Sequence, residues 1–178
     1  MHVGYFYVVP VAAFIVAAAV LDYRTRKIPN WLTVPTALLG LGYHLLAPDG
    51  AGALPALAGF AIGFGLLLLP FLLGGGGMGD VKMLAALGTW LGPVLILVAF
   101  AGGAMFAALM AIGLIFWSAV NEGILRTQRR YITAGAGATT TNGLPRPTRR
   151  VLPFAVPVAA STLLVLAWML LKSQQVGL

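Results

Sequence analysis

The chain has 178 residues, of which 60% are hydrophobic and only 8% are charged, and its 11 basic and 4 acidic side chains give a net charge of +7. About a quarter of an ordinary soluble domain is charged, so this composition excludes a soluble globular protein. The sequence has no cysteine, which excludes disulfides, thiolate metal sites and a cysteine nucleophile among these residues. We expect one integral membrane domain covering residues 1–178.

Apolar runs separated by charged, glycine-rich or proline-rich breaks predict an all-α membrane protein with about six transmembrane helices. No A-x-A-like cleavage site follows the first run, so we expect it to be a retained helix and not a signal peptide. In chain order, the predicted helices cover residues 3–21, 31–47, 53–73, 81–91, 93–120 and 153–171.

The fourth predicted helix is short, because only 11 residues lie between Asp80 and the helix-breaking pair Gly92-Pro93. The fifth is long and expected to be tilted. With both termini outside, ten of the 11 basic residues fall on the inner side, and only Lys172 falls outside. This positive-inside pattern predicts a protein of the cytoplasmic (inner) membrane. Residues 121–150 then form a basic cytoplasmic loop that faces anionic lipid, not nucleic acid.

Two of the four acidic residues have simple structural explanations. Asp49 lies in a Pro-Asp-Gly sequence, where a carboxylate typically hydrogen-bonds to the local backbone of a turn. Glu122 falls at the inner end of the fifth predicted helix, where a solvated carboxylate or a surface ion pair is expected. Neither residue is a candidate for catalysis.

Asp22 and Asp80 are different, because the predicted topology puts both carboxylates at the same depth on the cytoplasmic side. Acids at membrane depth are costly and commonly functional. A structural alternative exists for each: Asp80 could be the N-cap of the fourth helix, and Asp22 could pair with Arg24 or Arg26.

The glycines of residues 74–79 favour a functional role for Asp80. Glycine has no Cβ, so another peptide backbone can approach closely, as a peptide-bond hydrolase requires. Two carboxyl groups that share a site do not both ionise easily, so one can donate a proton while the other activates water. Other chemistries lack their residues: His2 and His44 fall near outer helix ends, so no metal or cofactor site is expected, and no Gly-Lys-Ser/Thr follows the glycines as a phosphate loop requires.

Around these aspartates the sequence resembles the prepilin peptidase family, aspartic membrane proteases of the GxGD type. One motif is Asp22 followed by Lys-Ile-Pro-Asn-Trp-Leu-Thr at residues 27–33, and the other is Gly-Met-Gly-Asp-Val-Lys at residues 77–82. A weaker similarity covers Leu-Pro-Phe-Ala-Val-Pro at residues 152–157.

The resemblance implies that Asp22 and Asp80 are the catalytic pair of an endopeptidase that cleaves the leader peptide of type IV prepilins, after a glycine, at the cytoplasmic membrane face. The substrate partner would be the prepilin's leader and apolar N-terminal helix. Simpler explanations remain for some motif residues, since Lys82 could only anchor the fourth helix and Pro29-Asn30 could only begin the second. The residues implied to shape the site or bind substrate are Gly77, Gly79, Lys82, Pro29 and Asn30.

Larger bifunctional members also carry paired Cys-x-x-Cys motifs and N-methylate the trimmed pilin. This cysteine-free chain begins almost directly with its first predicted helix. It therefore resembles the short, peptidase-only members of tight-adherence (Flp) pilus systems, which we favour, or the archaeal preflagellin peptidases.

Two other classes of function are alternatives to a peptidase. A small six-span cation or proton transporter subunit could use the two aspartates, although transport sites usually lie near the membrane midplane between inverted repeats. A non-catalytic assembly factor of the same fold would be suggested only by loss of an aspartate, and both are present.

Overall fold

The computed structural model describes residues 5–47, 50–73, 77–122 and 154–176. Every regular element within them is an α-helix, so the prediction of an all-α protein is confirmed for these residues. The helices are α1 (Tyr5–Thr25), α2 (Asn30–Leu46), α3 (Ala53–Leu72), α4 (Met78–Glu122) and α6 (Ala155–Val176).

Four stretches of these helices are long and apolar enough to cross a membrane, as expected of an integral membrane protein. The third is 40 residues long, about twice the length of one crossing. Six crossings with both termini outside remain a prediction. The four stretches are Phe6–Thr25, Ala53–Leu72, Met78–Trp117 and Ala155–Ser173.

The predicted break at Gly92-Pro93 is confirmed by a kink within α4. Gly92 has φ 72° and ψ −178°, so two helical segments meet there. A positive φ is readily adopted by glycine, and Pro93 has no N–H to continue the helical hydrogen bonds. The segment that carries Asp80 therefore ends as a separate short helix, as the sequence predicts.

Three predicted helix boundaries need correction, and one of them is the end of the last helix, which runs to Val176 and not to residue 171. The first helix does not end at residue 21 but continues to Thr25, so Asp22 belongs to its last turn. The short helix begins at Met78, not at residue 81. Hydropathy alone ends a helix where charges begin, whereas backbone hydrogen bonding continues through polar residues until the chain turns.

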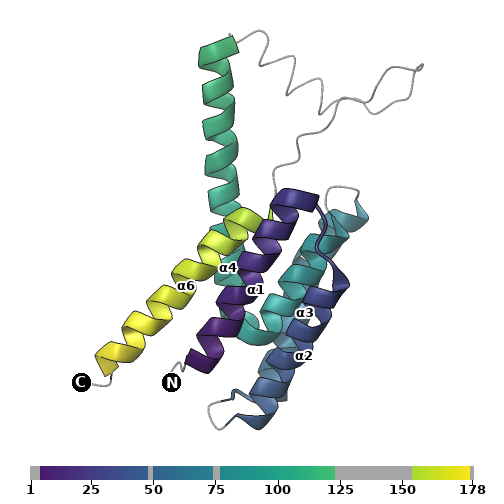
Figure 1. Cartoon of the computed structure of the whole chain (residues 1–178), viewed down its shortest axis with the longest axis vertical. Helices are drawn as coiled ribbons and strands as arrows, with labels where there is room; N and C mark the ends of the chain where they lie inside the picture. The colour runs from purple at the N-terminus through teal and green to yellow at the C-terminus, as the bar shows by residue number, and fades with distance from the viewer. Residues whose placement is uncertain (1–4, 48–49, 74–76, 123–153, 177–178) are drawn as a thin grey trace. The chain divides into compact units, whose positions relative to one another are not determined.

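The described residues fall into two compact units. One contains α1, α2, α3, α6 and α4 as far as Phe106, and the other contains the rest of α4 from Ala107. Within the first unit, α1 and α6 pack side by side and run in opposite directions (Figure 1). The end of α1 therefore meets the beginning of α6.

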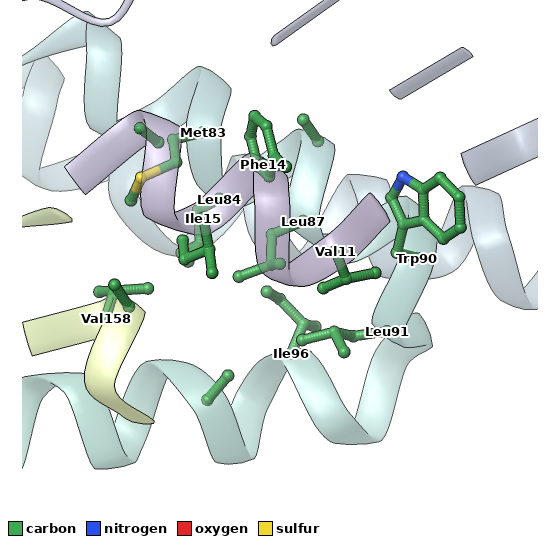
Figure 2. Close-up of a cluster of buried hydrophobic side chains, with 14 of the residues drawn as sticks. Val11, Phe14, Ile15, Met83, Leu84, Leu87, Trp90, Leu91, Ile96 and Val158 are labelled. Carbon is green, nitrogen blue, oxygen red and sulfur yellow. The ribbon is translucent and has the colours of Figure 1, made fainter. Parts of the chain in front are cut away.

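The core of the first unit forms where α1, α4 and α6 converge (Figure 2). Ile15, Leu87 and Val158, one from each helix, have no exposed surface. By contrast, the apolar side chains of Phe6 and Leu46 are 88% and 86% exposed. Such an exterior suits a protein whose solvent is lipid, in which close packing and not hydrophobic exclusion holds helices together.

α3 approaches the short segment of α4 through two glycines. A Cβ atom added to Gly59 would collide with the backbone oxygen of Gly88, and one added to Gly88 would collide with that of Gly59. Small residues allow helix backbones to come this close in membrane proteins. This contact fixes α3 against the helix that carries Asp80.

The backbone carbonyl of Trp90 accepts two hydrogen bonds from other helices, just before the kink. Tyr7 Oη and His44 Nε2 each lie 2.9 Å from the Trp90 oxygen. The Nδ1 atom of His44 accepts the N–H of Ala51 at 3.1 Å, which assigns the ring proton to Nε2. The kink at Gly92 leaves the Trp90 carbonyl near the end of a helical segment, where carbonyls lack N–H partners from the next turn. The side chains of Tyr7 and His44 take the place of those partners.

Candidate active site

Asp22 is a buried carboxylate in the last turn of α1, with 8% of its surface exposed. Its Oδ2 atom accepts a hydrogen bond from the backbone N–H of Ala155, the first residue of α6, at 3.2 Å. The guanidinium of Arg26 also interacts with it electrostatically. Of the two arginines that the sequence offers as partners, Arg26 is the one whose charge acts on Asp22 and that lines the same pocket.

Asp80 is half-buried at the third residue of α4. Its carboxylate accepts the backbone N–H of Gly77, and its own N–H donates to the Gly77 carbonyl at 3.1 Å. This is the reach-back half of a capping box, in which the third helical residue satisfies the N–H before the helix. Asp80 therefore caps α4, but from inside its first turn and not as the N-cap residue.

The two aspartates line one pocket of about 520 Å³. The negative charge of Asp22 acts on Asp80 across this pocket. The pocket opens where the end of α1, the beginning of α2 and the beginning of α4 meet, so the two aspartates that the sequence places at one membrane depth lie together in the structure. Its lining consists of Asp22, Arg26, Lys27, Ile28, Pro29, Asn30, Gly77, Met78, Gly79 and Asp80.

A tight turn connects the first aspartate to the second helix. Arg26 has φ 53°, and its N–H donates to the carbonyl of Asp22 at 2.9 Å, which ends α1 in the left-handed conformation usual at helix C-termini. Pro29 then occupies the N-cap position of α2 with φ −75° and ψ 150°. The chain thereby returns toward Asp22 and places Asn30 at the pocket.

The two sequence motifs contact each other directly. The Lys82 Nζ atom donates a hydrogen bond to Asn30 Oδ1 at 2.9 Å. A Cβ atom added to Gly79 would lie 3.3 Å from the Ile28 nitrogen, so the glycine allows the first turn of α4 to pack against the Ile-Pro-Asn segment. A Cβ atom added to Gly77 would lie 3.5 Å from Asp80 Oδ2. All seven residues singled out from the sequence thus lie in or beside one site.

Sequence reasoning missed the backbone N–H of Ala155. The weak similarity at residues 152–157 was the signal available, but a main-chain donor cannot be recognised from residue type.

The turn with Asp49, the glycines 74–76 and most of the loop at 121–150 lie outside the described residues, as does the side chain of Glu122. Among the residues that the structure describes, no group of three His, Cys, Asp or Glu side chains is placed to hold a metal ion.

The site thus defines a class of protein: an all-helical membrane protein with a pair of carboxyl groups in a pocket at one end of its helices. The profile of the type IV leader peptidase family matches residues 9–119, which include both aspartates. The chain therefore belongs to this family.

Several bacterial proteins are similar to the chain. Two examples among those described as prepilin leader peptidase/N-methyltransferase come from Burkholderia pseudomallei and Neisseria gonorrhoeae. The one from Burkholderia pseudomallei (strain 1026b) is 34% identical over 148 residues, covering 75% of this chain and 45% of the relative. The one from Neisseria gonorrhoeae is 36% identical over 110 residues, covering 56% of this chain and 38% of the relative. The leader peptidase HopD of Salmonella typhimurium is 38% identical over 85 residues, covering 44% of this chain and 55% of the relative. The chain spans about half the length of these relatives or less, and no solved structure matches it.

Proposed function

We propose that the chain is a membrane-embedded aspartic endopeptidase that removes the leader peptide from type IV prepilins. The observation that carries the proposal is the pocket that Asp22 and Asp80 line together, one aspartate from each sequence motif. Family membership supports the same reaction.

The chemistry follows from two carboxyl groups that bind one water molecule. One carboxylate accepts a proton from the water while the water oxygen attacks the carbonyl carbon of the scissile peptide bond. The other carboxyl group donates its proton to the amide nitrogen, which leaves as an amine when the carbon–nitrogen bond breaks. Gly77 has no side chain beside Asp80 Oδ2, where a Cβ atom would lie 3.5 Å from that oxygen, so an extended substrate backbone has room beside the pair.

The distribution of basic residues supports a pocket on the cytoplasmic side. Of the five Lys and Arg side chains within the described residues, four lie at the pocket end of the helices, and Lys172 lies near the other end of α6. Basic residues concentrate on the cytoplasmic side of membrane proteins. The scissile bond would then be cut as the leader emerges from the membrane. The four at the pocket end are Arg24, Arg26, Lys27 and Lys82.

We further propose that the substrate is a prepilin of the tight-adherence (Flp) type and that the product carries an unmodified amino terminus. The 178 residues contain no cysteine, so the paired Cys-x-x-Cys motifs of the bifunctional members are not among them. This part of the proposal rests on resemblance, and substrate preference and the mass of the new N-terminus test it.

The test is cleavage by the purified chain in lipid vesicles. Flp-type prepilin, a longer type IV prepilin and an archaeal preflagellin are supplied separately, each with and without a sulfonium methyl donor, and mass spectrometry of each product gives the new N-terminus. Cleavage after a leader glycine, with the Flp-type substrate preferred and no added methyl group, is the expected result. Failure on all three substrates would refute the peptidase, and preference for another substrate or a methylated product would refute the sub-type.

A further inference from the structure

One polar contact joins the candidate active site to the last helix. Oδ2 of Asp22 accepts the N–H of Ala155 at 3.2 Å, and Ala155 is completely buried. This N–H belongs to the first residue of a 22-residue helix. The N-terminal N–H groups of a helix have no helical acceptors, and the helix dipole favours negative charge beside them.

Packing fixes this donor in place. The ring of Phe154, the residue before α6, lies against Phe100 of α4 with centroids 6.3 Å apart. One turn further along α6, Val158 contacts α4 so closely that a Cβ atom added to Gly103 would lie 2.9 Å from its Cγ2 atom. The beginning of α6 therefore cannot shift without disturbing α4.

We propose that the backbone N–H of Ala155 is a positioning group for catalysis, which holds one oxygen of Asp22 and leaves the other available to water in the pocket. The inference rests on the proposed function and extends it to a third element of the site. A carboxylate on the last turn of a helix can otherwise rotate about its side-chain bonds. A fixed donor on the opposite helix selects one orientation, as the supporting groups of catalytic residues do.

Replacing Ala155 with proline removes this N–H and adds two ring carbons at a buried position. Proline is well tolerated at the first position of a helix, where its ring geometry suits the backbone. Ala155→Val is the matched control, because valine also has three side-chain carbons but keeps the N–H. The comparison between the two variants therefore separates the lost donor from added volume in a buried position.

The two variants are compared in the prepilin cleavage assay. A hydrogen bond to a charged group corresponds to roughly a tenfold to hundredfold effect. We expect kcat of Ala155→Pro to be at least about tenfold below that of Ala155→Val, with KM for the prepilin similar in both. Equal kcat values, or a loss confined to KM, would overturn the positioning role.

A second measurement does not depend on activity. The difference in melting temperature between Ala155→Pro and Ala155→Val is measured in detergent, first with Asp22 present and then in an Asp22→Ala background. The difference should shrink when Asp22 is absent, because its partner is gone. An unchanged difference would refute the bond itself. A wild-type chain that cleaves no substrate would refute the proposed function and the catalytic role of Ala155 together. The melting temperatures would still test whether the hydrogen bond between Ala155 and Asp22 exists.

If Ala155→Pro does not fold, Phe154→Ala provides another route. It leaves every N–H in place but removes the ring that holds the beginning of α6 against Phe100. This variant should lower kcat several-fold more than it changes KM, because the donor loses its fixed position. Full kcat in a folded Phe154→Ala protein would contradict the inference.

Discussion

Lys82 and Asn30 are joined by a hydrogen bond of 2.9 Å from Nζ to Oδ1, and this bond links the two motifs that supply the aspartates. Lys82 lies two residues after Asp80 in the first turns of α4, and Asn30 is the first residue of α2, directly after Pro29. The bond therefore fixes the beginning of α4 relative to the beginning of α2, with the pocket between them.

Breaking this bond should reduce activity more than stability. The pair is exposed, and exposed polar contacts contribute less than about 1 kcal/mol to the free energy of unfolding. Lys82→Met and Asn30→Ala should each lower kcat/KM several-fold, with little change in melting temperature. The losses should not be additive in the double variant, because the second change removes a bond already broken. Strictly additive losses would show that the two residues act separately.

The carboxyl groups of the pair should be indispensable. Asp22→Asn and Asp80→Asn keep nearly the same shape but cannot exchange a proton, so each should lower kcat by at least about 100-fold. Asp49→Asn makes the same chemical change in the predicted Pro-Asp-Gly turn and should remain fully active. The measurement is prepilin turnover in vesicles, with gel filtration to establish folding. Substantial turnover by either active-site variant would remove the pair from the mechanism.

Gly79 should tolerate no β-branched side chain. Its Cβ position is already 3.3 Å from the Ile28 nitrogen, so valine would push α4 away from the Ile-Pro-Asn segment and disturb Asp80 beside it. Gly65 on α3 is the matched control, because a Cβ atom there would meet nothing within 4 Å. We expect Gly79→Val to lose most of its cleavage activity and Gly65→Val to retain it. Equal tolerance in the assay would mean that close approach at Gly79 is unnecessary.

Gly59 should be essential to stability for a different reason. Alanine there would place Cβ against the backbone oxygen of Gly88 and within 2.7 Å of Gly92 Cα, and rigid backbone cannot yield as a side chain can. Overpacking of this kind costs about 1–3 kcal/mol. Gly59→Ala should therefore melt at a lower temperature than wild type, whereas Gly65→Ala should be neutral or slightly stabilised by helix propensity. Similar melting temperatures for both variants would contradict the observed packing.

Much of the site could be predicted because its strongest signals are rare residues. Only 4 acids occur in the chain, so the membrane depth of each one is informative, and the argument that brought Asp22 to Asp80 needed no knowledge of side-chain packing. The break at Gly92-Pro93 was equally clear, because both residues act on the backbone itself.

The remainder depends on tertiary contacts that leave little trace in sequence. Ala155 contributes a main-chain N–H, which almost any residue type would provide. His44 was expected only to lie near a helix end, yet both of its ring nitrogens have partners within the described residues, at Trp90 and Ala51. Such hydrogen bonds depend on the packing between helices, whereas hydropathy indicates only which residues form each helix.

The short segment of α4 is held at both ends by different helices. At the pocket end, Lys82 is bonded to α2, and before the kink the Trp90 carbonyl is bonded to Tyr7 of α1 and His44 of α2. A helical segment bonded at both ends does not tilt or translate independently of the helices that hold it. Because Asp22 itself lies on α1, any closure of Asp80 toward Asp22 must then be a small rotation of this segment about its long axis.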